Sequence, residues 1–297
     1  MLIQVISVKF TFIKYLACGN AFLLKDDRAG LSIPDVTKSE VVSRLCDCNL
    51  GVGADCILFL ENSRDSNVRL RVFDSTVREV IVSGDGLLCV ADYLFSKTVK
   101  NSLLIETGDG VKKIVRKGKH SFQVNMGSLK YQMRDLKRYC NGAYNDDEVL
   151  LEKNMDIPDL GSVTLSIVAL GDPRVIIFSD IVQPFNLKKY VAAISNNLKL
   201  FPKGVHLDFC QVENDAILHH QTVPLGFRFE INGSGAGAAA CAKVGQLTNK
   251  IRKNPVTVIS KNSELKINFN NNHILLTGSS EAIFQDSILL KLDYIPE

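Results

Sequence analysis

Two short glycine-rich stretches constrain the fold of this chain more than any other feature. They are Ser83-Gly84-Asp85-Gly86 and Asn232-Gly233-Ser234-Gly235. Each follows an apolar run that predicts a strand (80–82 and 227–231), and each leads into small apolar residues that predict a helix. A strand that enters a helix through two glycines is a tight and specific turn. Its recurrence 149 residues later (232 minus 83) therefore indicates an internally duplicated chain.

Other short motifs repeat in the same order at nearly the same offset. A single repeated motif of this kind can arise by chance, but three further repeated motifs at nearly the same offset as the glycine stretches support duplication. They are Gly19-Asn20-Ala21 with Gly171-Asp172-Pro173 (171 minus 19, 152), Gly51-Val52-Gly53-Ala54-Asp55 with Gly204-Val205-His206-Leu207-Asp208 (204 minus 51, 153), and Met126-Gly127 with Thr277-Gly278 (277 minus 126, 151).

The length of 297 residues fits two domains better than one. We expect a first half at 1–118, with 280–297 as candidates to return to it, and a second half at 119–279. The hydrophobic periodicity predicts many strands and one convincing apolar central helix in each half, the first at 84–96. The predicted class is α+β: two similar halves, each a curved, mainly antiparallel sheet wrapped around a central helix, with a ligand cleft between them.

Composition excludes several kinds of partner. A net charge of +3 does not indicate nucleic-acid binding, and no apolar run is long enough for a membrane span. The eight cysteines form no Cys-x-x-Cys pair, and no histidine stands at metal-ligand spacing from them. We therefore expect no metal, buried thiols and a reducing compartment, which indicates the cytoplasm.

The glycine-rich helix starts suit an anionic group. The first turn of a helix exposes unpaired backbone N–H groups at the positive end of the helix dipole, and glycine lets a ligand approach the backbone closely. This predicts ligand contacts at Gly84, Gly86, Gly233, Ser234 and Gly235. Neither stretch has the glycine spacing of the dinucleotide fingerprint or the lysine of the P-loop. The alternative is that these glycines only form tight turns.

From about residue 9 to 284 the chain resembles diaminopimelate epimerase and other cofactor-independent amino-acid racemases. The resemblance is carried by Gly19-Asn20-Ala21-Phe22, Gly51-Val52-Gly53-Ala54-Asp55, Cys89-Val90-Ala91, Phe201-Pro202-Lys203-Gly204-Val205, Leu275-Leu276-Thr277-Gly278 and both glycine stretches. It implies two similar α/β halves, no cofactor and a small amino-acid-like ligand. Dimers are common in the family, so a homodimer is the candidate assembly, although no stretch of the sequence specifies it.

The resemblance also exposes departures from the family's chemistry. That chemistry needs a cysteine before each Gly-x-Gly, one to remove the α-proton and one to return it, and this chain has Ser83 and Asn232 there. The family's Glu-Arg pair is replaced by Val223-Pro224, while Asn20 is kept. Further changes place Asp74, Asp85 and Asp172 where the family has asparagine, and His206 where it has another asparagine. The added carboxylates favour a cationic or zwitterionic ligand over a dicarboxylate.

Two functions remain open. The first is a repurposed isomerase or lyase in which one base acts on an amino-acid-like substrate. Asp85, Asp172 and His206 are then the candidate acid–base groups, with Asn20 and Asp74 as binding residues and Ser83 orienting the substrate. The second is a catalytically silent relative that binds a small molecule or a partner protein, as the loss of both cysteines favours. Hydrolysis by Ser83 has weaker support because the Gly-x-Ser-x-Gly elbow is absent.

Overall fold

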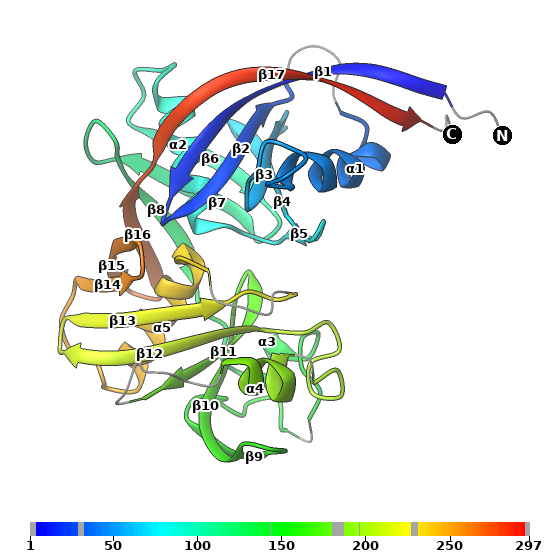
Figure 1. Ribbon diagram of the computed structural model, residues 1–297. Coiled ribbons are helices and arrows are strands. Elements are labelled where there is room, and N and C mark those ends of the chain that lie inside the picture. The colour runs from blue at the N-terminus through cyan, green and yellow to red at the C-terminus, as the bar shows by residue number, and fades with distance from the viewer. Residues whose placement is uncertain are drawn as a thin grey trace. The chain divides into compact units, whose positions relative to one another are not determined.

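The computed structural model describes residues 4–28, 33–142, 144–179, 187–195, 197–226 and 231–294. The chain divides into two compact units, the first made of 1–122 with 279–297 and the second of 123–278. Both are built mostly of strands with few helices, and their sheets mix parallel and antiparallel pairs (Figure 1). The expected α+β class is therefore confirmed at this level.

Unit 1 contains ten of the described elements. They are β1 (Gln4–Ala17), β2 (Asn20–Asp26), α1 (Asp35–Cys46), β3 (Cys56–Glu61), β4 (Val68–Asp74), β5 (Glu79–Val80), α2 (Gly84–Phe95), β6 (Ser102–Thr107), β7 (Gly110–Arg116) and β17 (Glu281–Tyr294). β1 and β17 form a long antiparallel ribbon, drawn in blue and red in Figure 1. Next to β1, the strands pair as β2 parallel to β3, β3 antiparallel to β4, β4 parallel to β6, and β6 antiparallel to β7.

The predicted central helix of the first half is α2. Every residue of α2 except Asp92 is buried, as a helix that is apolar all round requires. A second cluster of apolar side chains packs α1 against the sheet, and Phe59 makes edge-on ring contacts with Phe10 and Phe73 there. The strand predicted before the first glycine stretch is shorter than expected, because only Glu79 and Val80 pair, with β4.

The end of β2 allows a test of stability against pH. Arg28 donates from Nε to Asp26 Oδ1 (2.7 Å) and from Nη2 to Oδ2 (2.6 Å), and the Tyr93 hydroxyl donates to Oδ2 (2.8 Å). Burial alone would raise the pKa of Asp26, but these hydrogen bonds outweigh it and lower the pKa to about 2. The bonds therefore stabilise the fold at neutral pH, and their contribution is lost as pH falls from about 4 through about 2.

We expect Asp26→Asn to lower the free energy of unfolding by about 1–2 kcal/mol at pH 7, after allowance for partial solvent screening. The deficit should shrink as the pH approaches 2, where the wild-type carboxyl is also protonated. Urea unfolding of both proteins across this pH range measures it. The exposed Asp65 provides the control, and Asp65→Asn should behave as wild type throughout. A deficit that does not change with pH would contradict the assignment.

Unit 2 contains most of β8 (Ser121–Ser128) and the remaining elements. They are α3 (Met133–Leu136), β9 (Lys153–Ile157), β10 (Gly161–Leu170), β11 (Asp172–Phe178), α4 (Leu187–Tyr190), the π-helical turn η1 (Val191–Ser195), β12 (His206–Asn214), β13 (Ile217–Val223), α5 (Gly235–Leu247), β14 (Val256–Ser260), β15 (Ser263–Asn270) and β16 (His273–Ser279). The strand expected at 227–231 falls outside the described residues except for Ile231, which bridges to Thr222.

The strands of unit 2 pair in the same succession as those of unit 1. β11 runs parallel to β12, β12 antiparallel to β13, β13 parallel to β14, and β14 antiparallel to β15. The central helix is α5, buried from Gly235 to Gly245. Its small residues let the surrounding strands approach closely, and a Cβ at Gly237 in its first turn would lie 2.6 Å from Asp208 Oδ1 on β12.

No disulfide joins any of the eight cysteines, as expected, and six of them are buried. Cys56 is partly exposed and Cys48 fully exposed. Across the described ranges, none of the helices has the length and apolar character needed to cross a membrane.

Candidate functional site

The first glycine stretch forms the start of α2 in unit 1. Ser83 has extended backbone and is the N-cap, and its Oγ accepts a hydrogen bond from the Gly86 N–H at 3.0 Å. Among the described residues, no titratable side chain hydrogen bonds to this hydroxyl. Ser83 therefore caps the helix and has no base beside it that could make it a nucleophile.

Two predicted site residues meet at this helix start. Asn20, at the beginning of β2, donates from Nδ2 to Asp85 Oδ2 at 3.2 Å, and both side chains are buried. Asp85 lies in the first turn of α2, where the helix dipole favours a negative charge. The fold thus brings together Asn20 and Asp85 across 65 residues of sequence.

Asp74 stabilises the turn at the end of β4. Its Oδ1 accepts from the backbone N–H and the hydroxyl of Thr76 (3.0 and 2.6 Å), and its Oδ2 accepts from Arg78 Nε at 3.1 Å. The carboxylate thus organises the turn that follows the strand. A role in ligand binding remains a prediction for this residue, and its charge is balanced by Arg78.

The second glycine stretch is displaced by two residues relative to the sequence-based alignment. α5 begins at Gly235 with Ser234 as its N-cap, and Ser234 Oγ accepts from the Gly237 N–H at 3.1 Å. Helix geometry therefore pairs Ser83 with Ser234, 151 residues on (234 minus 83), and not with Asn232. Asn232 instead accepts a hydrogen bond from Asn262 Nδ2 at 2.8 Å. Both caps are serines in a shared Ser-Gly-x-Gly pattern, so neither helix start carries a thiol.

The cysteines inside the helices do not replace the missing thiols. Cys89 in α2 and Cys241 in α5 are both fully buried. Burial raises the pKa of each thiol well above its ordinary value, so both are protonated at neutral pH. A cysteine-based acid–base pair is absent from both helix starts.

Asp172 and His206, predicted separately, lie together in unit 2. They are the first residues of the parallel strands β11 and β12, both are buried, and Asp172 Oδ2 lies 4.0 Å from His206 Nε2. His206 Nδ1 accepts a hydrogen bond from the Leu225 N–H at 3.2 Å. In the neutral imidazole the proton therefore lies on Nε2, the nitrogen that faces the carboxylate.

A second layer of polar side chains lies two residues further along the same strands, and the sequence analysis did not predict most of it. Arg174 Nη1 donates to Asp208 Oδ2 at 2.9 Å, and His220 Nε2 lies 2.9 Å from Asp208 Oδ1. Arg174 and Asp208 follow Asp172 and His206 by two positions, so they share the face of the sheet that meets α5. Gly237 in the first turn of α5 touches this layer, since a Cβ there would be 2.6 Å from Asp208 Oδ1.

Burial and charge fix the ionisation of this layer. Burial works against the Asp208 carboxylate, but Arg174 and His220 outweigh it and hold its pKa below its ordinary value. Burial also works against a charged imidazole, but the Cys241 sulfur and the Asp208 carboxylate oppose it and raise the pKa of His220 above its ordinary value. Because Cys241 is a neutral thiol at neutral pH, the Asp208 carboxylate is the charge that stabilises the His220 imidazolium.

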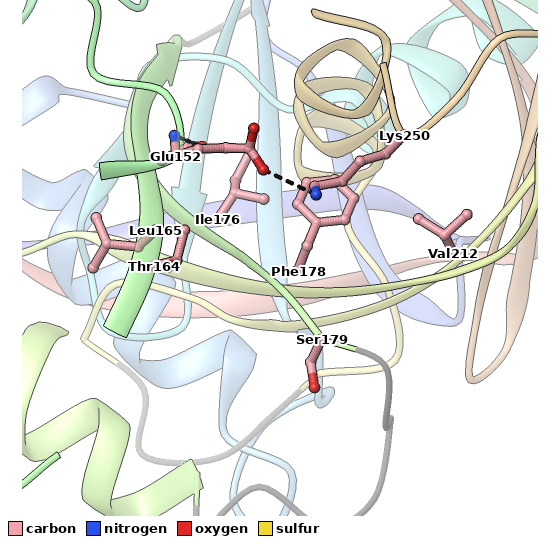
Figure 2. Close-up of a pocket in the computed structure, with 9 residues that line it drawn as sticks. Glu152, Thr164, Leu165, Ile176, Phe178, Ser179, Val212 and Lys250 are labelled. Carbon is pink, nitrogen blue, oxygen red and sulfur yellow. Dashed lines mark hydrogen bonds and ion pairs between the residues drawn. The ribbon is translucent and has the colours of Figure 1, made fainter. Parts of the chain in front are cut away.

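A pocket of about 470 Å³ lies elsewhere in unit 2. Its lining includes the ion pair of Lys250 Nζ with Glu152 Oε1 (2.9 Å) and the ring of Phe178 (Figure 2). Phe178 ends the strand that Asp172 begins, so the pocket is at the opposite end of β11 from the Asp172–His206 pair. None of the sequence-predicted site residues lines it.

The comparisons with known proteins agree with this architecture. The profile of the diaminopimelate epimerase family matches residues 12–132. A diaminopimelate epimerase of Caldanaerobacter subterraneus subsp. tengcongensis is 28% identical over 284 residues, covering 93% of this chain and 98% of that protein. A hydroxyproline epimerase of Agrobacterium vitis, solved with trans-4-hydroxy-L-proline, has a TM-score of 0.69 at 11% identity, covering 95% of this chain and 93% of that one.

A PhzF-family phenazine biosynthesis protein of Bacillus anthracis also shares the fold, with a TM-score of 0.65 at 13% identity and coverage of 95% of this chain and 100% of that one. The chain therefore shares the fold of these two structures. In sequence it is similar to diaminopimelate epimerase, as its motifs predicted, and it has no cysteine at either glycine-rich helix start.

Proposed function

We propose that this protein is an isomerase-type enzyme that moves a proton on a small amino-acid-like molecule without the two-cysteine chemistry of its relatives. The observation that carries the proposal is the buried Asp172–His206 pair, 4.0 Å apart at the starts of β11 and β12. The repeated strand pairing and the repeated Ser-Gly-x-Gly caps also support descent from a duplicated ancestor, as the sequence predicted.

The geometry of unit 2 suits a carboxylate beside a titratable group. The positive end of the α5 dipole lies at this turn, and Gly237 of the turn contacts the layer of Arg174 and Asp208. Asp172 and His206 lie two residues earlier on the same strands, about 7 Å toward the strand starts. A ligand carboxylate bound at the start of α5 would therefore hold its α-carbon near the Asp172–His206 pair.

Asp172 can act as the base and His206 as its partner. The Asp172 carboxylate takes the α-proton and becomes a carboxylic acid, while the Leu225 N–H holds His206 in the tautomer whose Nε2–H faces and orients that carboxylate. Returning the proton to the same carbon exchanges or racemises it, and returning it to a neighbouring carbon isomerises the substrate. The acidic residues also favour a substrate with a positive amino group.

Exchange of the α-hydrogen in D₂O tests the proposal. A panel of free amino acids and cyclic imino acids is incubated with the protein, and loss of the Cα–H signal is followed by proton NMR. We expect exchange of at least one compound, lowered about 100-fold or more by Asp172→Asn and about 10-fold by His206→Gln, as losses of a general base and of its partner are. The controls are His219→Gln and Asp156→Asn, which change the same residue types on β13 and β9 away from the pair.

Two results would contradict the proposal. One is full exchange by the Asp172→Asn variant. The other is a compound that raises the unfolding midpoint of the wild type and is never exchanged, which would identify a ligand-binding relative without turnover.

A further inference from the structure

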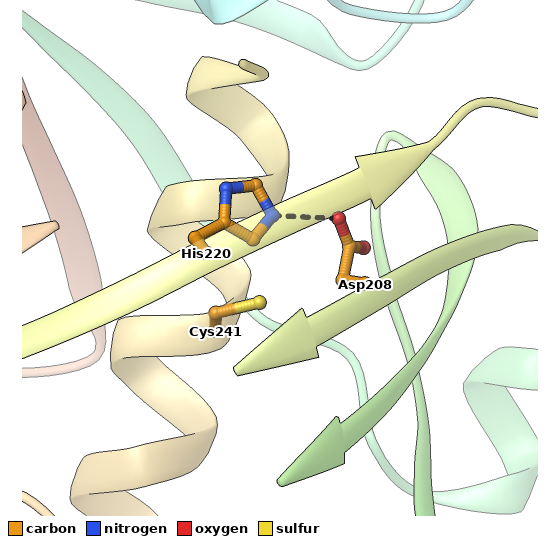
Figure 3. A group of neighbouring side chains, drawn as sticks. All are labelled: Asp208, His220 and Cys241. Atoms are coloured by element: carbon orange, nitrogen blue, oxygen red, sulfur yellow. Dashed lines mark hydrogen bonds and ion pairs between the residues drawn. The ribbon is translucent and has the colours of Figure 1, made fainter. Parts of the chain in front are cut away.

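A cysteine, a histidine and an aspartate from three different elements converge inside unit 2. Cys241 comes from α5, His220 from β13 and Asp208 from β12, and Figure 3 shows their side chains pointing toward one another. The three donor atoms all lie within 4.8 Å of each other, and all three residues are fully buried. Each belongs to a residue type that coordinates Zn²⁺ in proteins through sulfur, nitrogen or oxygen.

A fourth donor stands beside them. Cys210, two residues after Asp208 on β12, is within hydrogen-bonding reach of the Cys241 sulfur. Both cysteines are buried. The Cys210 sulfur is outside the group of donor atoms that lie within 4.8 Å of one another, so its side chain must turn toward the ion to complete the tetrahedral shell that structural zinc sites have.

The donor groups are oriented by outer contacts. Arg174 Nη1 binds Asp208 Oδ2 at 2.9 Å, so Oδ1 is the oxygen that faces His220. Ser260 Oγ lies 3.1 Å from His220 Nδ1, which directs Nε2 toward the other donors. A histidine ligand held through its second nitrogen and a carboxylate ligand held through its second oxygen are typical of protein metal sites.

Distance and charge are both compatible with a divalent ion. Ligands about 2.0–2.1 Å from a tetrahedral zinc stand about 3.3 Å apart, whereas Asp208 Oδ1 and His220 Nε2 are 2.9 Å apart. The ion therefore requires these two donors to separate by a few tenths of an ångström, and the Cys210 sulfur to make a larger movement toward it. Two thiolates and one carboxylate carry three negative charges, which Zn²⁺ and the Arg174 guanidinium would balance to zero within the core.

We propose that Asp208, His220, Cys210 and Cys241 form a structural Zn²⁺ site in the core of unit 2. All four donors are protein groups in a buried setting, so the ion would join β12, β13 and α5 and leave no open coordination position for a substrate. The sequence analysis expected no metal, because these residues do not stand at the short spacings by which metal motifs are recognised.

The first experiment measures metal in the whole protein. Wild type purified without chelator should contain about one Zn²⁺ per chain by mass spectrometry. Protein unfolded with chelator and refolded with Co²⁺ should show thiolate-to-cobalt charge-transfer absorption and the visible bands of a tetrahedral site. Adding Zn²⁺ to refolded apoprotein should raise the unfolding midpoint by on the order of 5 °C.

Matched cysteine variants locate the site. Cys241→Ser should lose the bound zinc, the charge-transfer band and the thermal shift. Cys89→Ser, which changes an equally buried cysteine in α2, should keep all three. If Cys241→Ser does not fold, the cobalt spectrum of wild type against that of Cys210→Ser decides the question. Wild type that holds no zinc, gives no thiolate–cobalt band after refolding and does not respond to Zn²⁺ would overturn the proposal and leave His220 and Asp208 as a proton-linked ion pair.

Discussion

Asp208→Ala should lower the free energy of unfolding by about 3–5 kcal/mol in protein stripped of metal with a chelator. Asp208 is fully buried and accepts from Arg174 Nη1 at 2.9 Å while facing His220 Nε2 at 2.9 Å. Removing the carboxylate leaves the buried Arg174 guanidinium without its counter-charge. The imidazolium of His220 loses its partner as well, so the cost exceeds that of an ordinary core truncation.

The size of this effect comes from the broken pair and does not measure the strength of the intact one. Two buried charges pay a desolvation cost that their attraction only roughly repays, so a complete pair contributes little net stability. For this reason the double variant Asp208→Ala with Arg174→Met should recover part of the loss. Urea unfolding of the single and double variants measures the coupling between the two residues.

Glu213→Ala is the matched control for Asp208→Ala. Glu213 lies on the same strand and its Oε2 is 2.6 Å from His219 Nε2, but this pair is exposed. Solvent-exposed pairs contribute about 0–1 kcal/mol, so the control should stay close to wild type. Equal losses from Asp208→Ala and Glu213→Ala would show that the polar layer under α5 is not held by charge.

The sequence predicted the elements of the fold because their signals are local. The apolar runs of α2 and α5 and the glycines before them are read within a dozen residues, and the structure has helices at both places. Asp172 and His206 were named as candidate site residues because the resemblance places them where the family has asparagine. Their approach to 4.0 Å results from parallel strand pairing, which no single stretch reveals.

Two features could not be read from the sequence. The start of α5 was placed two residues early because Gly233 and Gly235 satisfy the same spacing as Gly84 and Gly86, and only the capping bond of Ser234 resolves the alignment. The layer of Asp208, His220 and Cys241 is assembled from two strands and a helix. The one local signal was a polar residue at every second position of otherwise apolar strands, as with His206 and Asp208 on β12.

Gly237→Ala should lower the free energy of unfolding by about 2–4 kcal/mol, although alanine is the better helix former by about 1 kcal/mol. A Cβ at Gly237 would lie 2.6 Å from Asp208 Oδ1, 2.9 Å from Arg174 Nη1 and 3.0 Å from His220 Cε1. These atoms hold one another through short hydrogen bonds, so none can withdraw alone. The methyl group would therefore push α5 away from the sheet or break the buried network.

Gly245→Ala in the same helix provides the comparison. Its nearest neighbour would be Ile251 Cγ1 at 3.1 Å, a flexible apolar side chain that can move by a few tenths of an ångström. The gain in helix propensity should offset that adjustment, so this variant should unfold within about 1 kcal/mol of wild type in urea. If Gly237→Ala proved as stable as Gly245→Ala, the side chains of the polar layer would be able to move aside. The start of α5 would then not be held against this layer, and a carboxylate bound there would not be positioned near the Asp172–His206 pair.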